Sequence, residues 1–167
     1  MDAEALTELL QRHAGLIAKI AWAWCPRPDE REDVMQEIAI QLWRSWHRYD
    51  PRYAESTFVY RIALNTAISF ERRARRHGAR REALDVHAIT LAAAPAPEPT
   101  EDQERLRLLL DTLPALDKAL VLLWLDGNDH ASTAAVLGIS TSNVSTKLSR
   151  IKARLRSSLF EDTHGSR

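Results

Sequence analysis

Apolar side chains recur along this chain at intervals of three and four residues, which is the spacing of helices that bury one face. The first stretch predicts one helix over residues 3–24, ended by Pro26. Its core face would consist of Leu6, Leu9, Leu10, His13, Ile17, Ile20 and Trp24. We expect His13 to be a core histidine with its polar atoms satisfied, because no second metal ligand stands three or four residues away.

The second helix is predicted to begin at a capping box, Asp29 with Glu32, and to run to about Trp46. Its core stripe would be Met35, Ile38, Ala39, Leu42 and Trp46. A second set of side chains, turned away from that stripe, mixes polar and large apolar groups: Asp33, Gln36, Glu37, Ile40 and Trp43. Such a mix is typical of a partner surface with an aromatic anchor. A helix buried on two sides is the alternative, and the pattern alone does not decide between them.

A loop over residues 49–57 follows, with Asp50-Pro51 as a turn and Ser56 or Thr57 as the cap of the next helix. Aromatic side chains surround a cation in this loop: Tyr49, Tyr53 and Phe58 about Arg52. Aromatics beside a cation can stack on unpaired bases. They can equally be anchors that hold the loop, which is the interpretation that the loop alone favours.

The third helix, over residues 57–77, is predicted to have a buried face and a basic face. The buried stripe would be Val59, Ile62, Ala63, Phe70 and Ala74. The opposite face carries Arg61, Asn65, Ser69, Arg72 and Arg76, joined by Arg73 and Arg75. Only Glu71 interrupts it, whereas a solvated face would mix charges of both signs. This face therefore indicates contact with a phosphate backbone.

Residues 78–100 separate this N-terminal block from the rest of the chain. Three prolines alternate there, at Pro95, Pro97 and Pro99, which forbids a helix and favours an extended tether. Beyond the tether, two helices are predicted, one opened by Thr100 and one that runs from Pro114 to the turn Asp126-Gly127-Asn128. Their core residues would be Leu106, Leu109, Leu110 and Leu113, then Leu116, Leu120, Leu123 and Trp124.

The C-terminal part contains the pattern of a helix-turn-helix. Asp129 would cap a short helix, Gly138 would end it in the left-handed conformation, and Ser140 or Thr141 would cap the next helix. That second helix has one apolar stripe, formed by Val144, Leu148, Ile151 and Leu155. Off the stripe, residues 141–156 carry five basic side chains and no acid. A basic second helix is typical of one that lies in the major groove of DNA, although a helical hairpin with solvated charges would share the pattern.

These elements make the fold class all-α, with two small helical domains. Residues 1–77 would form a three-helix block, 78–100 a flexible linker, and 101–160 a four-helix block with the helix-turn-helix. Apolar residues make up 45% of the 167 positions, enough for packed cores, and five glycines are too few for turn-rich β architectures. The net charge is zero but uneven, because residues 71–82 and 141–156 are strongly basic.

Several function classes find no support in the sequence. A single cysteine, Cys25, excludes a disulfide framework and a four-cysteine zinc site. No phosphate-binding glycine loop, zinc-protease motif or obvious pair of carboxylates indicates an enzyme, and no residues are spaced as ligands of a metal or cofactor. The apolar runs are too short to span a bilayer, and the N-terminus has the wrong charge for a secretory leader. We therefore expect a cytoplasmic protein.

Two helical blocks joined by a Pro-rich tether, the second with a helix-turn-helix, resemble the bacterial sigma factors of the extracytoplasmic-function class, which keep only regions 2 and 4. The resemblance covers about residues 6–77 and 104–157. The motifs that carry it are Glu32-Asp33-Val34-Met35-Gln36-Glu37 with Leu42-Trp43, Tyr60-Arg61-Ile62-Ala63-Leu64-Asn65-Thr66-Ala67, Leu113-Pro114-Ala115-Leu116, Leu137-Gly138-Ile139-Ser140 and Asn143-Val144.

The resemblance implies a role for each of three surfaces. The docking surface for the coiled-coil of the polymerase clamp would be Asp33, Gln36, Glu37, Ile40 and Trp43. The surface that recognises and melts the minus-ten element of the promoter would be Arg52, Tyr53, Phe58, Arg61, Asn65, Arg72, Arg73 and Arg76. The surface that recognises the minus-thirty-five element would be Thr141, Ser142, Ser145, Thr146, Lys147, Ser149, Arg150 and Arg154. The implied partners are core RNA polymerase, promoter DNA and an anti-sigma protein, with no insertion into a membrane.

Two other functions share parts of this pattern. A free-standing helix-turn-helix regulator would bind operators without polymerase, and it would have no use for the face with Asp33, Gln36 and Glu37. A helical adaptor that sequesters a sigma factor would need neither of the two basic faces. Binding to core polymerase would distinguish a sigma factor from both of these alternatives.

Overall fold

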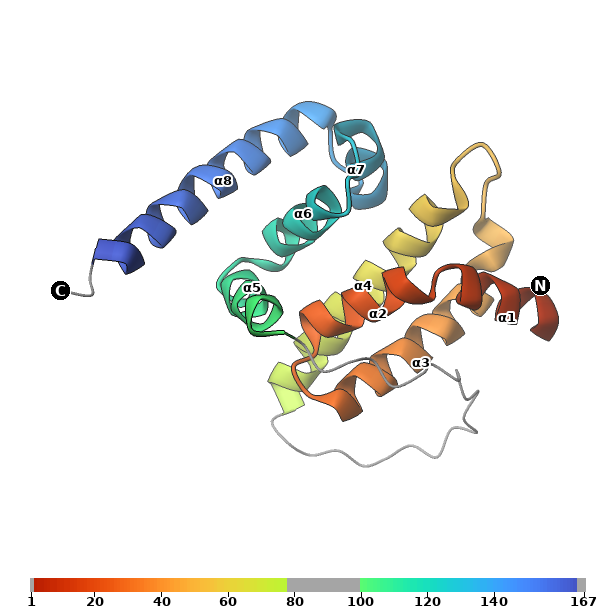
Figure 1. The fold of residues 1–167 in the computed structure, drawn as a ribbon. Helices are drawn as coiled ribbons and strands as arrows, with labels where there is room; N and C mark the ends of the chain where they lie inside the picture. Colours follow the sequence, from red (N-terminus) through yellow and green to blue (C-terminus); the bar gives the residue numbers. More distant parts are fainter. Residues whose placement is uncertain (1, 78–99, 165–167) are drawn as a thin grey trace. The chain divides into compact units, whose positions relative to one another are not determined.

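The structure of the chain is a computed structural model that describes residues 2–77 and 100–164, with the side chains of 75–77 and 158–164 left undescribed (Figure 1). Every regular element in the described ranges is a helix, as predicted for an all-α fold. Contacts between residues divide the chain into two units, Met1–Arg107 and Leu108–Arg167. Apart from Thr100, the predicted tether over 78–100 lies outside the described residues, so the three domain limits given above stay a prediction.

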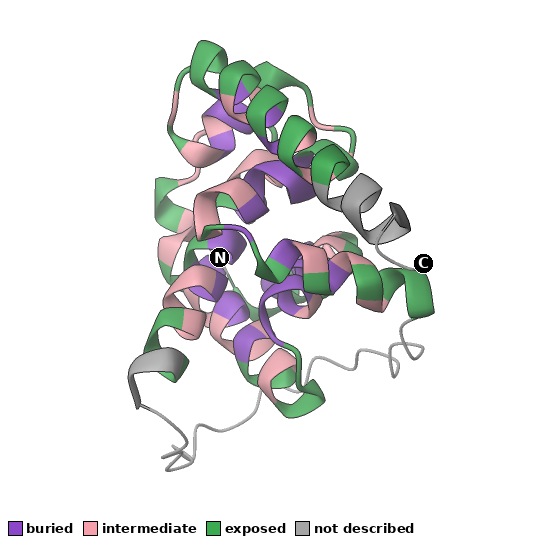
Figure 2. Cartoon of the chain, turned by 90° about the vertical axis from the view of Figure 1, so that its left-hand side faces the viewer, coloured by how far each residue is buried: buried purple, intermediate pink, exposed green. Residues whose placement is uncertain are grey.

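Among the described residues up to His77, four α-helices and one short 3-10 helix form the first unit. They are α1 (Ala3–Arg12), α2 (Ala14–Trp24), α3 (Pro28–Ser45), the 3-10 helix η1 (Trp46–Arg48) and α4 (Glu55–His77). The helices α2, α3 and α4 pack against one another, and α1 packs on α2 and α3. The centre of this packing is formed by Ile20, Val34, Ile38, Leu42, Val59 and Leu64, on the helix sides that are coloured as buried in Figure 2.

The prediction of one helix over 3–24 is wrong, because two helices meet at His13. The backbone of His13 leaves the helical conformation, with φ −109° and ψ 13°. Its amide donates to Leu9 O at 3.1 Å and its carbonyl accepts from the Ile17 amide at 3.0 Å, so His13 closes α1 and starts α2. The apolar period continues across the break, which is why periodicity alone predicted one helix. As predicted, His13 has a polar partner, since Nε2 lies 2.8 Å from Glu55 Oε1, but its side chain is half-buried and is not part of the core.

The start of α3 also differs from the prediction. The helix begins at Pro28, with Arg27 as the N-cap and no side-chain cap, so the capping box of Asp29 and Glu32 does not form. Proline suits the first position of a helix, because it has no amide hydrogen to leave unpaired and its φ is already helical. Arg27 pairs instead with Glu30 in the first turn, at 3.0 Å.

The buried faces of α3 and α4 are rotated from the predicted ones. The residues buried as predicted are Ile38, Ala39 and Leu42 on α3 and Val59 and Ala63 on α4. The residues buried without being predicted are Val34, Tyr60, Leu64, Thr66 and Ala67. The predicted core residues that are half-buried or exposed are Met35, Trp46, Ile62, Phe70 and Ala74. The difference arises because α3 and α4 each contact more than one helix, and a single stripe describes only one such contact.

The helices that follow residues 78–99 are α5 (Glu101–Asp111), α6 (Ala115–Leu125), α7 (His130–Leu137) and α8 (Thr141–His164). The boundary between the two units falls within α5, between Arg107 and Leu108. Thr100 caps α5 as predicted, in a reciprocal box with Gln103. The Thr100 amide donates to Gln103 Oε1 at 2.9 Å, and Thr100 Oγ1 accepts from the Gln103 amide at 3.3 Å. Lys118, a buried residue of α6, donates to Asp111 at the end of α5 at 2.7 Å. The helix α8 packs on α6 and α7.

The end of α6 lies at the predicted turn. Gly127 has φ 77°, which glycine adopts without strain, and Asn128 donates from Nδ2 to Leu123 O at 3.0 Å. One core prediction on α6 is wrong, because the Trp124 side chain is 43% exposed. Lys152 Nζ of α8 lies 4.0 Å from the centroid of that ring. A cation over an indole face is attracted to it, which favours this half-exposed place over a buried one.

The cap of α7 gives the C-terminal unit a dependence on pH. The Ser132 amide donates to Asp129 Oδ1 at 2.7 Å and holds the pKa of Asp129 below its usual range. Such a carboxyl stabilises the folded unit at pH values above its ordinary pKa, and the contribution is lost as pH falls through the lower pKa of the folded state. Asp129→Asn keeps an acceptor at this position but does not titrate. We therefore expect the melting temperature of this variant to fall less steeply than that of the wild type as the pH is lowered. Melting curves of both proteins from about pH 5 to about pH 2.5 measure this difference. An equal fall of the melting temperature in both proteins would contradict the stabilising role of Asp129.

Candidate functional site

The helix-turn-helix forms as the sequence predicted. Gly138 ends α7 in the left-handed region, at φ 68°. Its amide donates to Ala134 O at 2.9 Å, and the Ile139 amide shares that acceptor at 3.3 Å. Of the two candidate caps of α8, Ser140 fills the position, because its Oγ accepts from the Asn143 amide at 3.2 Å. These bonds fix the angle at which α8 leaves α7.

The helix α8 has one buried face and one exposed face. Val144, Leu148 and Ile151 are buried and Leu155 is half-buried, as the predicted stripe requires. The exposed members of the candidate DNA surface are Thr141, Ser142, Ser145, Thr146, Ser149, Arg150 and Arg154. Hydroxyl groups gather at the N-terminal end of this face, and guanidinium groups follow further along. Hydroxyls can hydrogen-bond to base edges and guanidinium groups to phosphates, so the face suits a DNA groove.

Lys147 differs from the rest of this candidate surface. Its side chain is 33% exposed, and Nζ lies 3.4 Å from Asp117 Oδ1 of α6. An ammonium that is already paired within the protein contributes less free energy to binding a DNA phosphate, because the internal pair is weakened when the new contact forms. The structure therefore predicts a smaller contribution to DNA binding from Lys147 than from Arg150, a difference that the sequence did not predict.

We expect Arg150→Ala to lower the salt slope of duplex binding by about one unit, and Lys147→Ala to lower it by clearly less. Asp117→Asn should act in the opposite direction, because it frees the Lys147 ammonium and removes a charge that repels phosphates. Its gain in affinity should be the same for any duplex, and adding Lys147→Ala should reduce the gain to the part that comes from the lost Asp117 charge. Fluorescence anisotropy with a labelled duplex over a series of salt concentrations measures these slopes. Equal losses from the two alanine variants would contradict the assignment.

The helix α3 presents the predicted mixed face on the side away from Val34, Ile38 and Leu42. On that face, Asp33 is exposed, the Trp43 side chain is 55% exposed, and the half-buried members are Gln36, Glu37 and Ile40. Glu37 Oε1 accepts from Gln41 Nε2 at 3.0 Å, one turn along the helix. A large indole with this much exposed surface beside polar groups is typical of a contact site. Its exposure favours a partner surface over a helix that is buried on two sides.

Aromatic packing holds the loop that follows α3. Tyr49 stacks on Trp46 with ring centroids 4.8 Å apart, and Phe58 meets these two rings at 5.4 and 5.8 Å. The Tyr49 hydroxyl donates to Tyr53 O at 3.1 Å. Tyr49 and Phe58 are therefore anchors of the loop, whereas the Tyr53 ring is 56% exposed. Only Tyr53 of these three predicted aromatics is open to an unpaired base.

The cation of the loop, Arg52, is exposed and pairs with Asp50. Arg52 Nη2 donates to Asp50 Oδ2 at 2.6 Å, and this hydrogen bond lowers the pKa of the Asp50 carboxyl. The helix α4 begins at Glu55, so Ser56 and Thr57 lie in its first turn and do not cap it. The predicted DNA face of α4 is exposed at Arg61, Asn65, Arg72 and Arg73, and the side chain of Arg76 lies outside the described ones.

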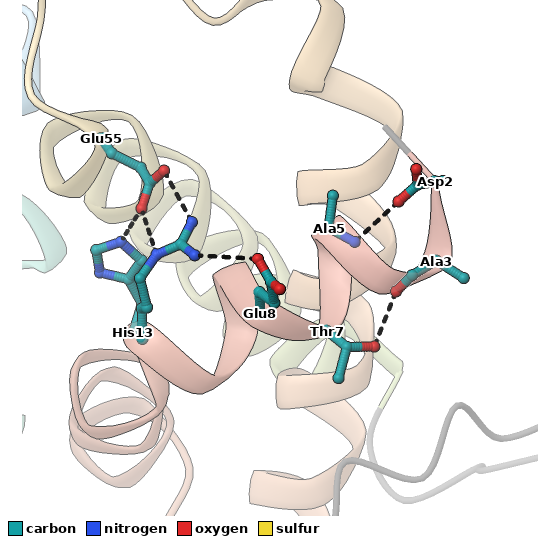
Figure 3. Close-up of polar contacts among 8 residues, drawn as sticks. Asp2, Ala3, Ala5, Thr7, Glu8, His13 and Glu55 are labelled. Carbon is teal, nitrogen blue, oxygen red and sulfur yellow. Dashed lines mark hydrogen bonds and ion pairs between the residues drawn. The ribbon is translucent and has the colours of Figure 1, made fainter.

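The structure brings together three residues that the sequence did not group: Arg12, His13 and Glu55, which we call the Glu55 cluster (Figure 3). Glu55 accepts from Arg12 Nε at 3.2 Å and Nη2 at 3.1 Å, and its Oε1 lies 2.8 Å from His13 Nε2. Partial burial raises the pKa of Glu55, but the hydrogen bonds from Arg12 and His13 outweigh it and leave the pKa lowered. Glu55 lies 42 residues after His13 and 43 residues after Arg12, so no local sequence pattern could have predicted this cluster.

Two further properties concern the described part of the chain. Among the described side chains, those of residues 2–74 and 100–157, no three His, Cys, Asp or Glu groups lie together so that they could hold a metal ion. The helices of the same ranges lack the combined length and apolarity that are needed to cross a bilayer.

Both parts of the chain that the structure describes match the models of a known family. The family descriptions that match are Sigma-70 region 2 over residues 9–77 and Sigma-70, region 4 over residues 103–155. The ECF RNA polymerase sigma factor SigE of Mycolicibacterium smegmatis is 30% identical over 155 residues, which cover 89% of this chain and 59% of that protein. The chain belongs to the extracytoplasmic-function class of the sigma-70 family. This sigma factor therefore spans less than two thirds of the length of SigE.

Other sigma factors match over nearly their whole length. CnrH of Cupriavidus metallidurans is 28% identical to this sigma factor over 169 residues, 95% of this chain and 88% of that one. The structure of CnrH in complex with the cytosolic domain of CnrY has a TM-score of 0.70 at 22% identity, over 96% of this chain and 91% of that one. The sigma factor RpoE of Bartonella quintana, in complex with the anti-sigma factor NepR, has a TM-score of 0.70 at 19% identity, over 96% and 99% of the two chains. These structures share the fold.

Proposed function

We propose that the chain is a transcription initiation factor, which binds core RNA polymerase and directs it to particular promoters. The exposed mixed face of α3 carries this proposal, because it occurs in the same chain as a helix-turn-helix. A protein that only binds DNA has no use for an exposed Trp43 beside Asp33 and Gln36. Membership of the sigma-70 family supports the same function.

Each of the three surfaces has a part in this function. The α3 face with Trp43 docks on the coiled-coil of the polymerase clamp. The loop over 49–57 and the basic face of α4 contact the minus-ten element, and the exposed face of α8 contacts the minus-thirty-five element. The hydroxyls near the start of α8 determine the base preference, with about 1–3 kcal/mol of discrimination per contact. They belong to Ser142, Ser145 and Thr146. Arg150 holds phosphate and adds affinity for any sequence.

Control by a separate protein belongs to the proposal. CnrH and RpoE were each solved with a bound partner, which is the cytosolic domain of CnrY for the first and the anti-sigma factor NepR for the second. We extend this to the present chain and expect an anti-sigma protein that holds it away from polymerase. The chain would then work in the cytoplasm, where polymerase and DNA are, and would act by binding, with no catalytic group of its own.

The test is transcription of genomic DNA by purified core polymerase, with and without the chain, followed by mapping of the 5′ ends of the transcripts. We expect the chain to co-purify with core and to produce start sites that core alone does not use. Those sites should share sequence elements in the minus-ten and minus-thirty-five regions. A chain that ignored core polymerase yet bound discrete DNA sites by itself would instead be a free-standing regulator. A chain that bound a sigma factor and no DNA would be an adaptor.

A further inference from the structure

The Glu55 cluster joins two places that are far apart in the sequence. Arg12 and His13 lie where α1 ends and α2 begins, and Glu55 is the first residue of α4. Figure 3 shows His13 pointing toward the Glu55 carboxylate from the end of α1. Glu55 directly follows the loop residues 50–54, so contacts that hold Glu55 also hold one end of that loop.

The geometry of this cluster distinguishes it from an exposed ion pair, which typically adds little to stability. The His13 and Glu55 side chains are only 15% and 30% exposed. Arg12 presents Nε and Nη2 to the two oxygens of Glu55, and His13 adds a third contact. Because an ionised carboxylate only accepts, Nε2 of His13 is the donor. Three charge-assisted contacts fix the orientation of the carboxylate as well as its position.

The break at His13 allows one carboxylate to contact two consecutive residues. In a continuous helix, neighbouring side chains point about 100° apart. The ψ of 13° at His13 departs from the helical value at this point, and both side chains reach Glu55. An acid in the first turn also suits the positive end of α4, yet that role needs neither Arg12 nor His13. The cluster therefore accounts for an irregularity that the apolar pattern does not explain.

The other end of the loop is held independently of Glu55. Tyr49 stacks on Trp46 and touches Phe58, and its hydroxyl bonds to Tyr53 O. Between the two anchors the loop presents Arg52 and Tyr53 to solvent. A loop that is fixed at both ends holds its exposed side chains ready before a ligand arrives, which lowers the entropy lost on binding.

We propose that Glu55, held by Arg12 and His13, is a positioning residue that sets the loop over 50–54 for capture of an unpaired promoter strand. This rests on the proposed function of the loop at the minus-ten element. Glu55 acts through Tyr53 and Arg52 and has no contact with DNA of its own. Arg12 and His13 thereby become part of strand recognition, although they precede the loop by about forty residues.

The test uses holoenzyme reconstituted from core polymerase and the full chain. Its ligand is a promoter fragment, chosen from the mapped start sites, with the non-template strand of the minus-ten element left unpaired. Glu55→Gln keeps the size of the side chain but removes its charge, and the amide nitrogen that replaces one carboxylate oxygen donates and cannot accept from Arg12 Nη2 as Oε2 does. We expect this variant to bind the fragment about tenfold more weakly, while it co-purifies with core like the wild type.

Three further variants separate positioning from general stability. His13→Ala should share the defect, and His13→Gln, which restores a side-chain donor, should recover binding. Glu8→Gln removes only a 3.7 Å contact to Arg12, so it should bind like the wild type.

Two outcomes would overturn the positioning role. One is wild-type binding of the fragment by Glu55→Gln. The other is a parallel loss of core binding and fragment binding, because that marks general loss of folding in the first unit. A wild-type holoenzyme that forms but does not bind the fragment is a different result, since it contradicts the proposed role of the loop at the minus-ten element.

Discussion

Replacing Leu148 by alanine should lower the free energy of unfolding of the C-terminal unit by about 2–5 kcal/mol. Leu148 is 3% exposed and lies between Val144 and Ile151 on the buried face of α8, where that helix packs on α6 and α7. The substitution removes apolar contacts and leaves a cavity among helices that form only a few layers. Small domains have a total stability of only about 5–15 kcal/mol, so the substitution should remove a large part of it.

Hydrogen exchange in increasing denaturant measures this effect for each unit separately. Ser149→Ala is the matched control, because Ser149 is the next residue along and is exposed. It should change the stability by no more than about 0.5 kcal/mol. The amides of α1 to α4 should keep their protection when Leu148 is replaced. Loss of protection in both units together would show that they do not fold independently.

The second large effect is expected on polymerase binding. Replacing Asp33 and Gln36 together by alanine should weaken binding to core by about 2 kcal/mol or more, the scale of an interface hot spot. Both residues lie on the face of α3 that points away from Val34 and Ile38, so the helix content and the melting temperature should stay unchanged. Equilibrium binding of the labelled chain to core polymerase measures the loss. Transcription from a mapped promoter should fail with it.

A control on another helix makes this result specific. Glu4 and Gln11 are an exposed acid and an exposed amide on α1, so their joint replacement by alanine removes the same chemical groups from the same unit. That variant should bind core like the wild type. Trp43→Ala should also weaken binding, although part of the Trp43 side chain is covered by the protein, so this variant also changes packing within the first unit. Undiminished binding by the Asp33 and Gln36 variant would remove the α3 face from the polymerase interface.

Much of this fold could be predicted because the signals are local. Helical period, Thr100 and Asp129 as caps, and Gly138 as a left-handed end all depend on residues within one or two turns, and the structure confirms each. The starts of α3 and α4 were less well predicted. Proline at the first helical position competed with the capping-box pattern at Asp29, and the stronger constraint on φ decided the start.

The features that the sequence did not reveal depend on residues that are distant along the chain. The break at His13 involves Glu55, which is 42 residues away, and the pairing of Lys147 involves Asp117, which is 30 residues away. Periodicity is blind to both, because it describes one face of one helix at a time. Trp124 illustrates the same limit, since its place under Lys152 is set by the packing of α8 on α6.

The placement of Trp124 also gives the C-terminal unit an optical signal of its own. The other tryptophans of the sequence are Trp22, Trp24, Trp43 and Trp46, so Trp124 is the only indole that follows the tether. Its ring is partly open to water and lies 4.0 Å from the Lys152 ammonium. A phosphate that draws this ammonium away, or a protein that covers the ring, should shift the emission and alter its quenching. The difference between the emission of the wild type and that of Trp124→Phe isolates this signal, so the engagement of α8 could be followed in real time without an added dye.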